Sequence, residues 1–439
     1  MFGPGDSGSC ASRQPQSASA TVELCSPGAL PASSKGESMA STLSARTRVD
    51  ALYVAAAFAG TNIASYLMTV IAARLLVPAT FGEFGSLTAV LVIGAVPAMG
   101  LQTVVALKVA RQPEQDRGQL VTLGLLTSAT IMVTALVASP LLMVLLHIDN
   151  PWTVIFLALA LAPITLVGLC YGILQGTERF GLMARLIALE GVGRVGGTLT
   201  GLLIFRTPTG AFAGAAIGAS LVALSGWLIC GRPLPGRRGA GHVTEVLHAI
   251  QALLALVLLV NLDLVLARHS LPAHQAGEYA VGSVVTKIAY WLPYAIAVVV
   301  LPKLANEGVR RKLVPKALAI VAAVDSLVVI GCAVLGPTVV ALVGGAAYSS
   351  SSIPVWPFAL VGSLLSLVQL LLYSRIASAD RRSTLLTWLA VATEITLVLG
   401  WWHGSLTQVV TGAVVATAAL ACFGALIEFR TRVEPVDTR

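Results

Sequence analysis

Six ionisable side chains stand out in this sequence because they fall within long apolar runs. Burying an isolated charge is costly, so such side chains usually pair with one another or face a water-filled cavity. They are therefore candidates for binding a charged ligand, for carrying an ion or a proton, or for structural ion pairs. The six are Glu190, Arg194, Asp263, Lys287, Asp325 and Glu394.

Glu190 and Arg194 have the i, i+4 spacing that places two side chains on one helix face. One interpretation is an intrahelical ion pair that hides both charges. Another is that Arg194 faces a central cavity and binds an anionic pyrophosphate, since the guanidinium fork matches phosphate oxygens. The two interpretations are compatible, and both stay open here.

A cation and three aromatic rings share one face of a later apolar run, at positions i, i+3, i+4 and i+7. Such a face suits the attraction of phosphate and the stacking of sugar rings. The alternative is packing combined with an aromatic belt at a membrane interface. The residues are Lys287, Tyr290, Trp291 and Tyr294.

The three carboxylates Asp263, Asp325 and Glu394 form an acidic group in the second half of the chain. Carboxylates at membrane depth can bind Na⁺ or H⁺. The alternative is an interhelical salt bridge, for instance between Asp263 and Lys287.

A polar face also lies in the first apolar run. It is expected either to form interhelical hydrogen bonds or to line a cavity. Its residues are Asn62, Ser65, Tyr66 and Thr69.

The composition shows what kind of molecule must hold these side chains. The 439 residues are 56% hydrophobic and 11% charged, with a mean hydropathy of +0.86. Soluble domains carry about 25% charged residues. We therefore predict an all-α polytopic membrane protein and exclude a soluble multidomain enzyme. The six cysteines lack metal-like spacing, and we expect no cofactor or metal.

Twelve apolar segments follow a tail rich in Ser, Ala, Gly and Pro. We predict a disordered tail over 1–45, a first lobe over 46–230, a cytoplasmic linker over 231–248, a second lobe over 249–429 and a C-terminal tail over 430–439. Met39 is an alternative translation start. The spans are predicted at 51–73, 84–107, 120–146, 152–176, 186–205, 211–230, 249–267, 280–302, 314–335, 354–377, 384–402 and 405–428.

The basic residues sort by membrane side. With the N-terminus in the cytoplasm, the inner segments hold 23 Lys and Arg residues and the outer segments hold 3, namely Arg74, Arg206 and Arg268. This asymmetry predicts that both termini are cytoplasmic. The net charge of +8 therefore indicates topology, and no nucleic-acid partner is expected.

The first and second halves repeat the same landmarks at offsets of 194 to 196 residues. Two copies of a six-helix unit are therefore expected, related by a pseudo-two-fold axis along the membrane normal. The matching elements are Arg74, Phe81-Gly82-Glu83-Phe84, Pro97 and Lys108-Val109-Ala110 in the first copy, and Arg268, Ala276-Gly277-Glu278-Tyr279, Pro293 and Lys303-Leu304-Ala305 in the second.

These elements resemble the polysaccharide-export (oligosaccharide flippase) branch of the multidrug/oligosaccharidyl-lipid/polysaccharide (MOP) superfamily. The resemblance covers about residues 50–430 and implies a MATE/MOP-like fold with two six-helix lobes. It also implies a cation site in the second half, so that role is transferred first to Asp263, which lies in the Asn-x-Asp element. The elements are Ala73-Arg74-Leu75-Leu76-Val77-Pro78-Ala79-Thr80-Phe81-Gly82-Glu83-Phe84, Asn261-Leu262-Asp263, Gly277-Glu278-Tyr279, Leu292-Pro293 and Leu301-Pro302-Lys303-Leu304-Ala305.

The leading functional hypothesis is a flippase in the cytoplasmic membrane that translocates a lipid-linked oligosaccharide or polysaccharide precursor. Its expected partners are that glycan, membrane lipids and the polymerase or glycosyltransferases of the same pathway. The alternative is a cation-coupled multidrug antiporter. A membrane enzyme is disfavoured, because the loop 231–248 holds only Glu245 as a carboxylate and the chain lacks a P-loop.

Overall fold

Helices form every regular element in the part of the chain that the structure describes. The computed structural model describes residues 34–111, 117–236, 243–292, 307–348, 351–376 and 381–433. Contacts divide the chain into two compact units, Met1–Arg48 and Val49–Arg439.

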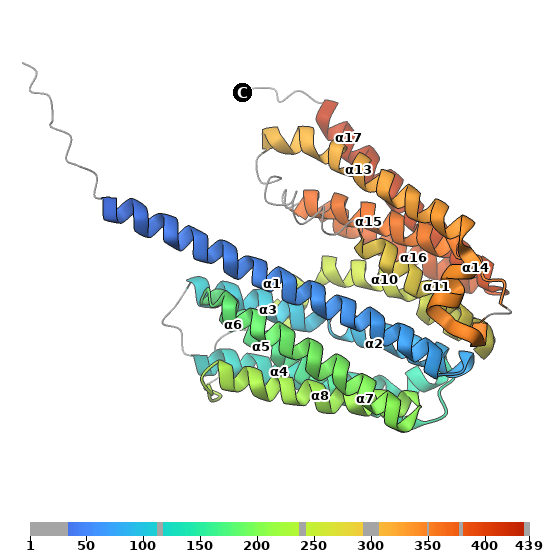
Figure 1. The fold of residues 1–439 in the computed structure, drawn as a ribbon, viewed down its shortest axis with the longest axis horizontal. Coiled ribbons are helices and arrows are strands. Elements are labelled where there is room, and N and C mark those ends of the chain that lie inside the picture. Colours follow the sequence, from blue (N-terminus) through green and yellow to red (C-terminus); the bar gives the residue numbers. More distant parts are fainter. Residues whose placement is uncertain are drawn as a thin grey trace, which may run out of the picture. The chain divides into compact units, whose positions relative to one another are not determined.

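The first half of the chain contains the helices of the first lobe (Figure 1). Their bounds are α1 (Ser34–Leu75), α2 (Pro78–Gly94), α3 (Val96–Arg111), α4 (Arg117–Leu146), α5 (Pro151–Gly176), α6 (Phe180–Glu190), the π-helical turn η1 (Gly191–Val195), α7 (Gly196–Phe205) and α8 (Pro208–Ile229).

The short helix α9 (Val243–Ala249) precedes the second lobe. The helices of the second lobe are α10 (Gln251–Ser270), α11 (Ala273–Trp291), α13 (Glu307–Val334), α14 (Gly336–Gly344), the 3₁₀ turn η3 (Gly345–Tyr348), α15 (Trp356–Ile376), α16 (Arg381–Gly400) and α17 (Leu406–Val433).

The predicted spans coincide with these helices. Within the described residues, nine helical stretches are long and apolar enough to cross a membrane. Helices α11, α15 and α16 lie at the three remaining predicted spans. The described residues therefore have the arrangement of a multi-pass membrane protein, with helices at all twelve predicted spans in two lobes.

The first helix begins earlier than the sequence led us to expect. Helix α1 starts at Ser34, whereas a disordered tail was predicted over 1–45. No Gly or Pro occurs between Glu37 and Ala59, so nothing interrupts the helix upstream of the apolar run. Residues 1–33 lie outside the described part.

Prolines and side-chain caps set several helix starts. Pro78, Pro151 and Pro208 each occupy the first turn, where the missing N–H costs nothing. The Asn150 side chain accepts a hydrogen bond from the Trp152 N–H at 3.1 Å and caps α5. The second predicted span is interrupted at Ala95, between α2 and α3.

Glycines at every fourth position bring η1 and α7 into close contact with α8. These two glycine ladders are Gly193, Gly197 and Gly201 on one side and Gly210, Gly214 and Gly218 on the other. A Cβ atom at Gly201 would lie 2.0 Å from the Gly210 carbonyl oxygen, and one at Gly197 would lie 2.3 Å from that of Gly214. Only glycine permits this approach of the two backbones. The ladders fix the helix that carries Arg194.

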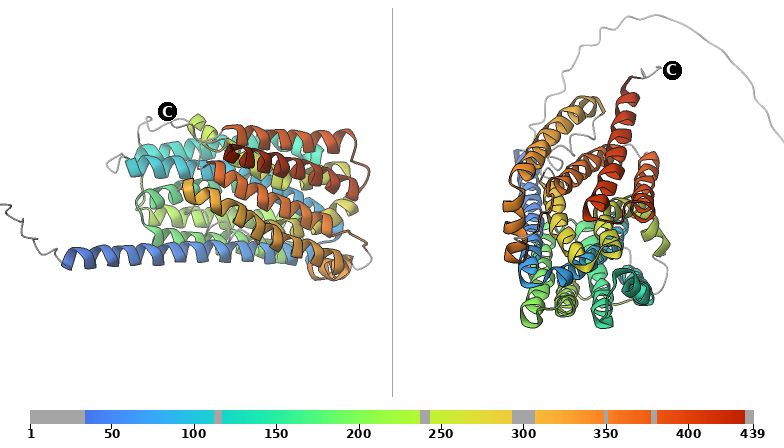
Figure 2. Two further views of the ribbon diagram at one scale, coloured as in Figure 1. Left: turned by 90° about the horizontal axis from the view of Figure 1, so that it is seen from above. Right: turned by 90° about the vertical axis from the view of Figure 1, so that its right-hand side faces the viewer.

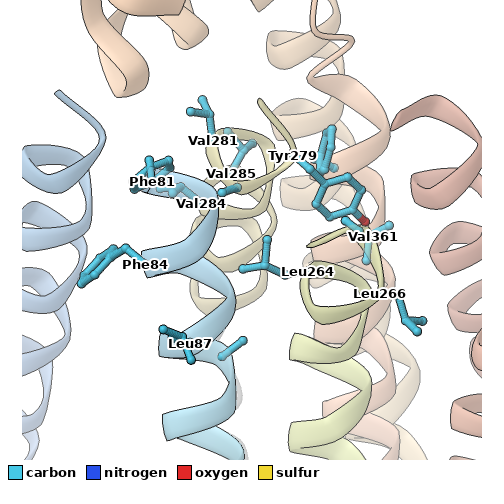
Figure 3. Packing of buried hydrophobic residues seen from close by; sticks show 14 of the residues in the cluster. Phe81, Phe84, Leu87, Leu264, Leu266, Tyr279, Val281, Val284, Val285 and Val361 are labelled. Atoms are coloured by element: carbon cyan, nitrogen blue, oxygen red, sulfur yellow. The ribbon is translucent and has the colours of Figure 1, made fainter. Parts of the chain in front are cut away.

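The two lobes form two groups of helices, the first blue to green and the second yellow to red (Figure 2). Helix α2 of the first lobe packs against α10 and α11 of the second lobe and so connects the two lobes. Figure 3 shows Phe81 of α2 beside Val281 and Val284 of α11, within one buried apolar cluster. This contact joins the two copies of the repeated sequence element.

Candidate functional site

Arg194 lies in the π-helical turn η1, directly after α6. Single π turns within α-helices occur frequently at functional sites. Its Nε donates a hydrogen bond to Glu190 Oε1 at 3.3 Å. The intrahelical ion pair predicted from the spacing is therefore confirmed. The two side chains are 25% and 23% exposed, so the pair is not fully enclosed by the surrounding helices.

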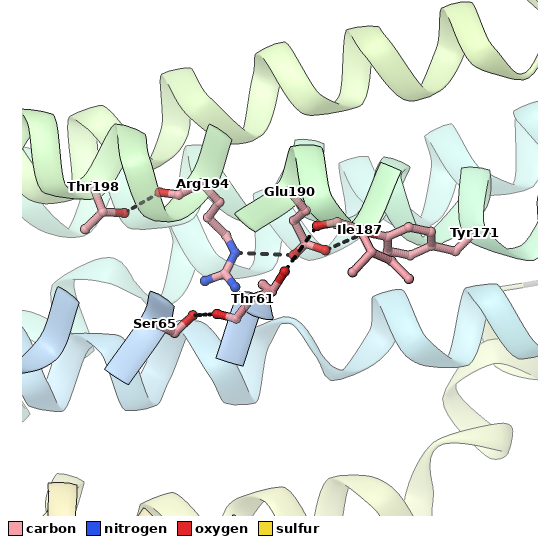
Figure 4. Close-up of polar contacts among 7 residues, drawn as sticks. All are labelled: Thr61, Ser65, Tyr171, Ile187, Glu190, Arg194 and Thr198. Atoms are coloured by element: carbon pink, nitrogen blue, oxygen red, sulfur yellow. Dashed lines mark hydrogen bonds and ion pairs between the residues drawn. The ribbon is translucent and has the colours of Figure 1, made fainter. Parts of the chain in front are cut away.

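Two side chains that the sequence did not single out complete this group (Figure 4). The Tyr171 hydroxyl of α5 donates to Glu190 Oε2 at 2.7 Å. The Thr61 hydroxyl of α1 donates to the Ile187 carbonyl oxygen at 3.3 Å. Glu190 thus has a partner on each carboxylate oxygen. By contrast, the terminal nitrogens of Arg194 donate no hydrogen bond within the described part of the chain.

The polar side chains on this face of α1 form their hydrogen bonds within the same helix. Asn62 donates to the Phe58 carbonyl oxygen, Ser65 to that of Thr61 and Thr69 to that of Ser65, all at 2.9 Å. For these three residues the expected interhelical hydrogen bonding was wrong, because polar side chains in helices can bond the carbonyl four residues earlier. Tyr66 is half-buried on the same helix.

Asp263 lies on α10 and is 3% exposed. The Tyr279 hydroxyl of α11 donates to its Oδ2 atom at 3.0 Å. Asn261, two residues earlier, turns its amide to the Val257 carbonyl oxygen of its own helix. Tyr279 belongs to the second copy of the repeated element, where it stands in place of Phe84, so only the second copy supplies a hydroxyl partner for a buried carboxylate.

Glu394 of α16 joins Asp263 in the second lobe. It is fully buried, and neither carboxylate oxygen has a hydrogen-bond partner among the described residues. Electrostatic interactions link Asp263 both to Glu394 and to Lys287 of α11. A direct salt bridge between Asp263 and Lys287 is absent from the described part of the chain.

Asp325 lies apart from that pair. It sits on α13, where Ser366 of α15 donates to its Oδ2 atom at 2.7 Å. Its other oxygen and the Ser363 hydroxyl have no partner among the described residues. The structure therefore brings together two of the three predicted coupling carboxylates and places the third on a different pair of helices.

The predicted cation-aromatic face is described in part. Lys287 and Trp291 are half-buried and Tyr290 is buried, with the two rings edge to face at 5.6 Å. Tyr294 lies outside the described residues. Lys287 therefore interacts with Asp263 through charge, and the aromatic pair lies one turn further along α11.

The two lobes carry chemically different groups. The first offers a cation with unused donors on a π turn. Around Asp263, the second offers that carboxylate, the carboxylate of Glu394, the Tyr279 hydroxyl and Lys287. Oxygen atoms in such a cluster suit a small hard cation or a proton. No group of three or more His, Cys, Asp or Glu residues of metal-binding geometry occurs in the described ranges.

Comparison with solved structures identifies the fold of the chain. The chain is similar to an inward-facing multidrug resistance MATE family transporter of the MOP superfamily, with 15% identity, 86% of this chain and 96% of that chain covered, and a TM-score of 0.64. It is similar to the lipid II flippase MurJ in an inward closed conformation, with 13% identity, coverage of 86% and 88%, and a TM-score of 0.67. No protein-family model and no curated protein sequence matches the chain.

A third similar structure is a MOP superfamily transporter from Pyrococcus furiosus whose binding pocket is described as having reverse polarity. Its identity is 14%, the coverage is 87% of this chain and 94% of that chain, and the TM-score is 0.52. This chain has the MOP transporter fold. The resemblance found in the repeated elements is thus confirmed at the level of architecture. Because this fold serves a drug transporter and a lipid flippase alike, the cargo must be argued from the chain's own side chains.

Proposed function

We propose that this protein is a flippase that moves a lipid-linked oligosaccharide or polysaccharide precursor across the cytoplasmic membrane by alternating access. The observation that supports the proposal most directly is the environment of Arg194. This residue is partly exposed, it is held on a π turn by one hydrogen bond to Glu190, and its terminal nitrogens are unused in the described part of the chain.

In this proposal, Arg194 exchanges its partner Glu190 for the pyrophosphate of the cargo. A pyrophosphate carries more negative charge than one carboxylate and accepts the two parallel hydrogen bonds of a guanidinium fork. When phosphate binds, Glu190 keeps the Tyr171 hydrogen bond, which limits the cost of losing its ion pair. Lys287 of α11 supplies a second positive charge, and the half-buried Trp291 supplies an aromatic face for the sugar. Tyr290 is buried in the apolar cluster and supports Trp291 by packing. The prenyl tail stays in the bilayer.

Asp263 and Glu394 supply the coupling step in this proposal. A flippase with this fold needs an energy source, and two buried carboxylates with interacting charges suit the binding of Na⁺ or H⁺. Lys287 acts on Asp263 through charge and so links the ion site to the helix that carries the aromatic pair.

The second candidate is a cation-coupled multidrug antiporter. The buried carboxylates of the second lobe favour it, because an acidic site also attracts an organic cation. Arg194 argues against it in the first lobe. Its charge is accessible there, whereas Glu190 is engaged on both oxygens.

A transport assay in proteoliposomes separates the two candidates. We expect the purified protein to translocate a fluorescent undecaprenyl-pyrophosphoryl oligosaccharide, and excess unlabelled lipid of the same class to compete. A fluorescent organic cation loaded into matched liposomes should leave at the rate seen in protein-free controls. Export of the organic cation without movement of the pyrophosphoryl lipid would favour the antiporter and overturn the flippase.

The location proposed for the chain is the cell membrane, with both termini in the cytoplasm. The basic residues of the inner segments support this orientation. Reporter fusions at the C-terminus test it, since a phosphatase active only outside should be inactive there and a cytoplasmic fluorescent protein should be bright. Glycosyltransferases or a glycan polymerase encoded beside this chain would support the proposed pathway partners.

A further inference from the structure

Arg268 connects the two lobes at one end of the molecule. It lies in the last turn of α10, in the second lobe, and is 7% exposed. Its Nε donates to the Leu146 carbonyl oxygen at 2.9 Å, and its terminal nitrogens donate to those of Ala79 and His147 at 3.3 Å. All three acceptors belong to the first lobe. One buried guanidinium therefore holds the end of α4 and the start of α2.

Arg74 makes the reverse connection. It lies in the last turn of α1, in the first lobe, and donates to the Leu342 carbonyl oxygen of α14, in the second lobe. Its side chain also passes Gly345, whose added Cβ would lie 3.2 Å from Arg74 Cγ. Arg74 is exposed, unlike Arg268. The two contacts are thus reciprocal in direction and unequal in burial.

The internal repeat relates these two contacts. Arg268 follows Arg74 by 194 residues, and Leu342 follows Leu146 by 196, which matches the offset between the two halves. In each lobe the donor ends the first membrane helix. In the first lobe the acceptor Leu146 ends the third membrane helix, α4, and in the second lobe Leu342 lies near the C-terminal end of the short helix α14 that follows the third, where carbonyl groups lack helical partners. The repeat therefore places an arginine-to-carbonyl contact between the lobes twice, once in each direction.

The backbones of α2 and α11 also meet at this end. A Cβ at Gly82 would lie 2.9 Å from the Gly277 nitrogen, and one at Gly277 would lie 2.0 Å from the Pro78 carbonyl oxygen. Glu83, beside Gly82, interacts through charge with Arg268 across the same contact. The repeated Gly-Glu element therefore forms a close contact between the lobes, next to Arg268.

We propose that Arg74 and Arg268 form a reciprocal latch that keeps the two lobes closed at this end and that must release during each transport cycle. The inference rests on the proposed function in one respect, because release has a purpose only in an alternating-access carrier. The topology predicted from the basic residues places the latch on the outer side. Arg268, with three acceptors and a buried side chain, is the stronger arm, and Arg74 is the weaker.

The distance between the lobes reports the latch directly. Spin labels at Trp152 and Trp401 suit this measurement, because these side chains are 58% and 68% exposed and lie at the start of α5 and just after α16. The labels are introduced by Trp152→Cys and Trp401→Cys in a full-length protein whose native cysteines are replaced by serine. A second label pair within the first lobe, at Trp152 and Phe205, serves as the internal reference.

Arg268→Ala should raise the ratio of long to short distances between the lobes by about tenfold or more, and Arg74→Ala by a smaller factor. Arg268→Lys should fall between Arg268→Ala and the parent, because an ammonium group cannot reach three carbonyls in a fork. The matched control is Arg206→Asn. Arg206 also ends a membrane helix, but it is exposed and has the left-handed conformation that Asn tolerates. The control should leave both label pairs unchanged.

The latch is overturned if Arg268→Ala and Arg74→Ala give folded, monodisperse protein with the parent distance distribution. If Arg268→Ala does not fold, Arg74→Ala and Arg268→Lys decide the question alone, and unchanged distances in both overturn it. The measurement uses no cargo. A latch that opens in the variants of a protein that moves no pyrophosphoryl lipid would therefore contradict the proposed cargo and leave the latch standing.

Discussion

The charged groups of the two lobes differ in how completely they are satisfied. In the first lobe Glu190 has a partner on each oxygen, and its ion pair with Arg194 keeps about a quarter of each side chain exposed. In the second lobe Glu394 is fully buried with both oxygens unpartnered among the described residues, and Asp263 has Tyr279. The two copies of the repeat therefore share one architecture but differ in their charged groups. The first lobe holds a partly exposed ion pair, and the second lobe holds buried carboxylates.

In the proposed flippase, this difference assigns different tasks to the two groups. A side chain that meets a bulky ligand must be reachable and must have a substitute partner when the ligand leaves, which describes Arg194. A site for a small ion or a proton gains selectivity from burial and from oxygen atoms that lack other partners, which describes Asp263 and Glu394. Changing each group in turn should therefore affect different steps of transport.

Replacing the first-lobe cation should have the largest effect. We expect Arg194→Ala to lower translocation of the pyrophosphoryl lipid by about 10- to 100-fold, since a hydrogen-bonded charge contributes ~1.5–3 kcal/mol. Arg194→Lys, which keeps the charge without the fork, should retain an intermediate rate. The measurement is initial rate in proteoliposomes at equal protein content. Wild-type rates in the alanine variant would remove Arg194 from the cargo site.

Neutralising the second-lobe site should remove the dependence of transport on an ion gradient and affect cargo binding less. We expect Asp263→Asn to move the lipid at a rate that no longer responds to an imposed Na⁺ or H⁺ gradient. Asn keeps an acceptor for the Tyr279 hydroxyl, so the fold should survive. The test compares rates with and without each gradient. A gradient response equal to that of the parent would assign Asp263 to structure.

The support of the first-lobe site can be tested at the glycine ladder. Gly201→Ala places a methyl group 2.0 Å from the Gly210 carbonyl oxygen, so α7 and α8 must move apart. Overpacking of this kind costs about 1–3 kcal/mol. We expect a lower melting temperature in detergent. Gly196→Ala, on the same helix with nothing within 4 Å of the added Cβ, is the matched control and should melt like the parent.

Apolar length and helical spacing, which are local properties of the sequence, were sufficient to predict much of this fold. The spans follow from apolar length, and the Glu190–Arg194 pair follows from helical spacing, so both could be predicted from the sequence. The π turn at Arg194 carries no comparable signal, because the same residues fit an uninterrupted α-helix. Helix α1 likewise extends into the predicted tail, since composition alone does not show where a helix stops.

Contacts between helices were harder to predict. Tyr171 and Tyr279 were missed as partners of Glu190 and Asp263 because each lies on a neighbouring helix, and one sequence does not fix which helices pack together. The repeat offset correctly paired Arg74 with Arg268. That each donates to the opposite lobe depends on how the lobes face one another, which is a property of the packed structure.

The smallest effect should come from Asp325, which the sequence grouped with the other two carboxylates. Its partner is Ser366 of α15, and no electrostatic interaction with Asp263 or Glu394 is found in the described part of the chain. Asp325→Asn keeps an acceptor for Ser366, so we expect transport within about twofold of the parent and an unchanged response to the ion gradient. Measured beside Asp263→Asn, this variant sharpens the comparison between sites. Loss of the gradient response in Asp325→Asn, with the response retained in Asp263→Asn, would relocate the ion site to α13 and α15.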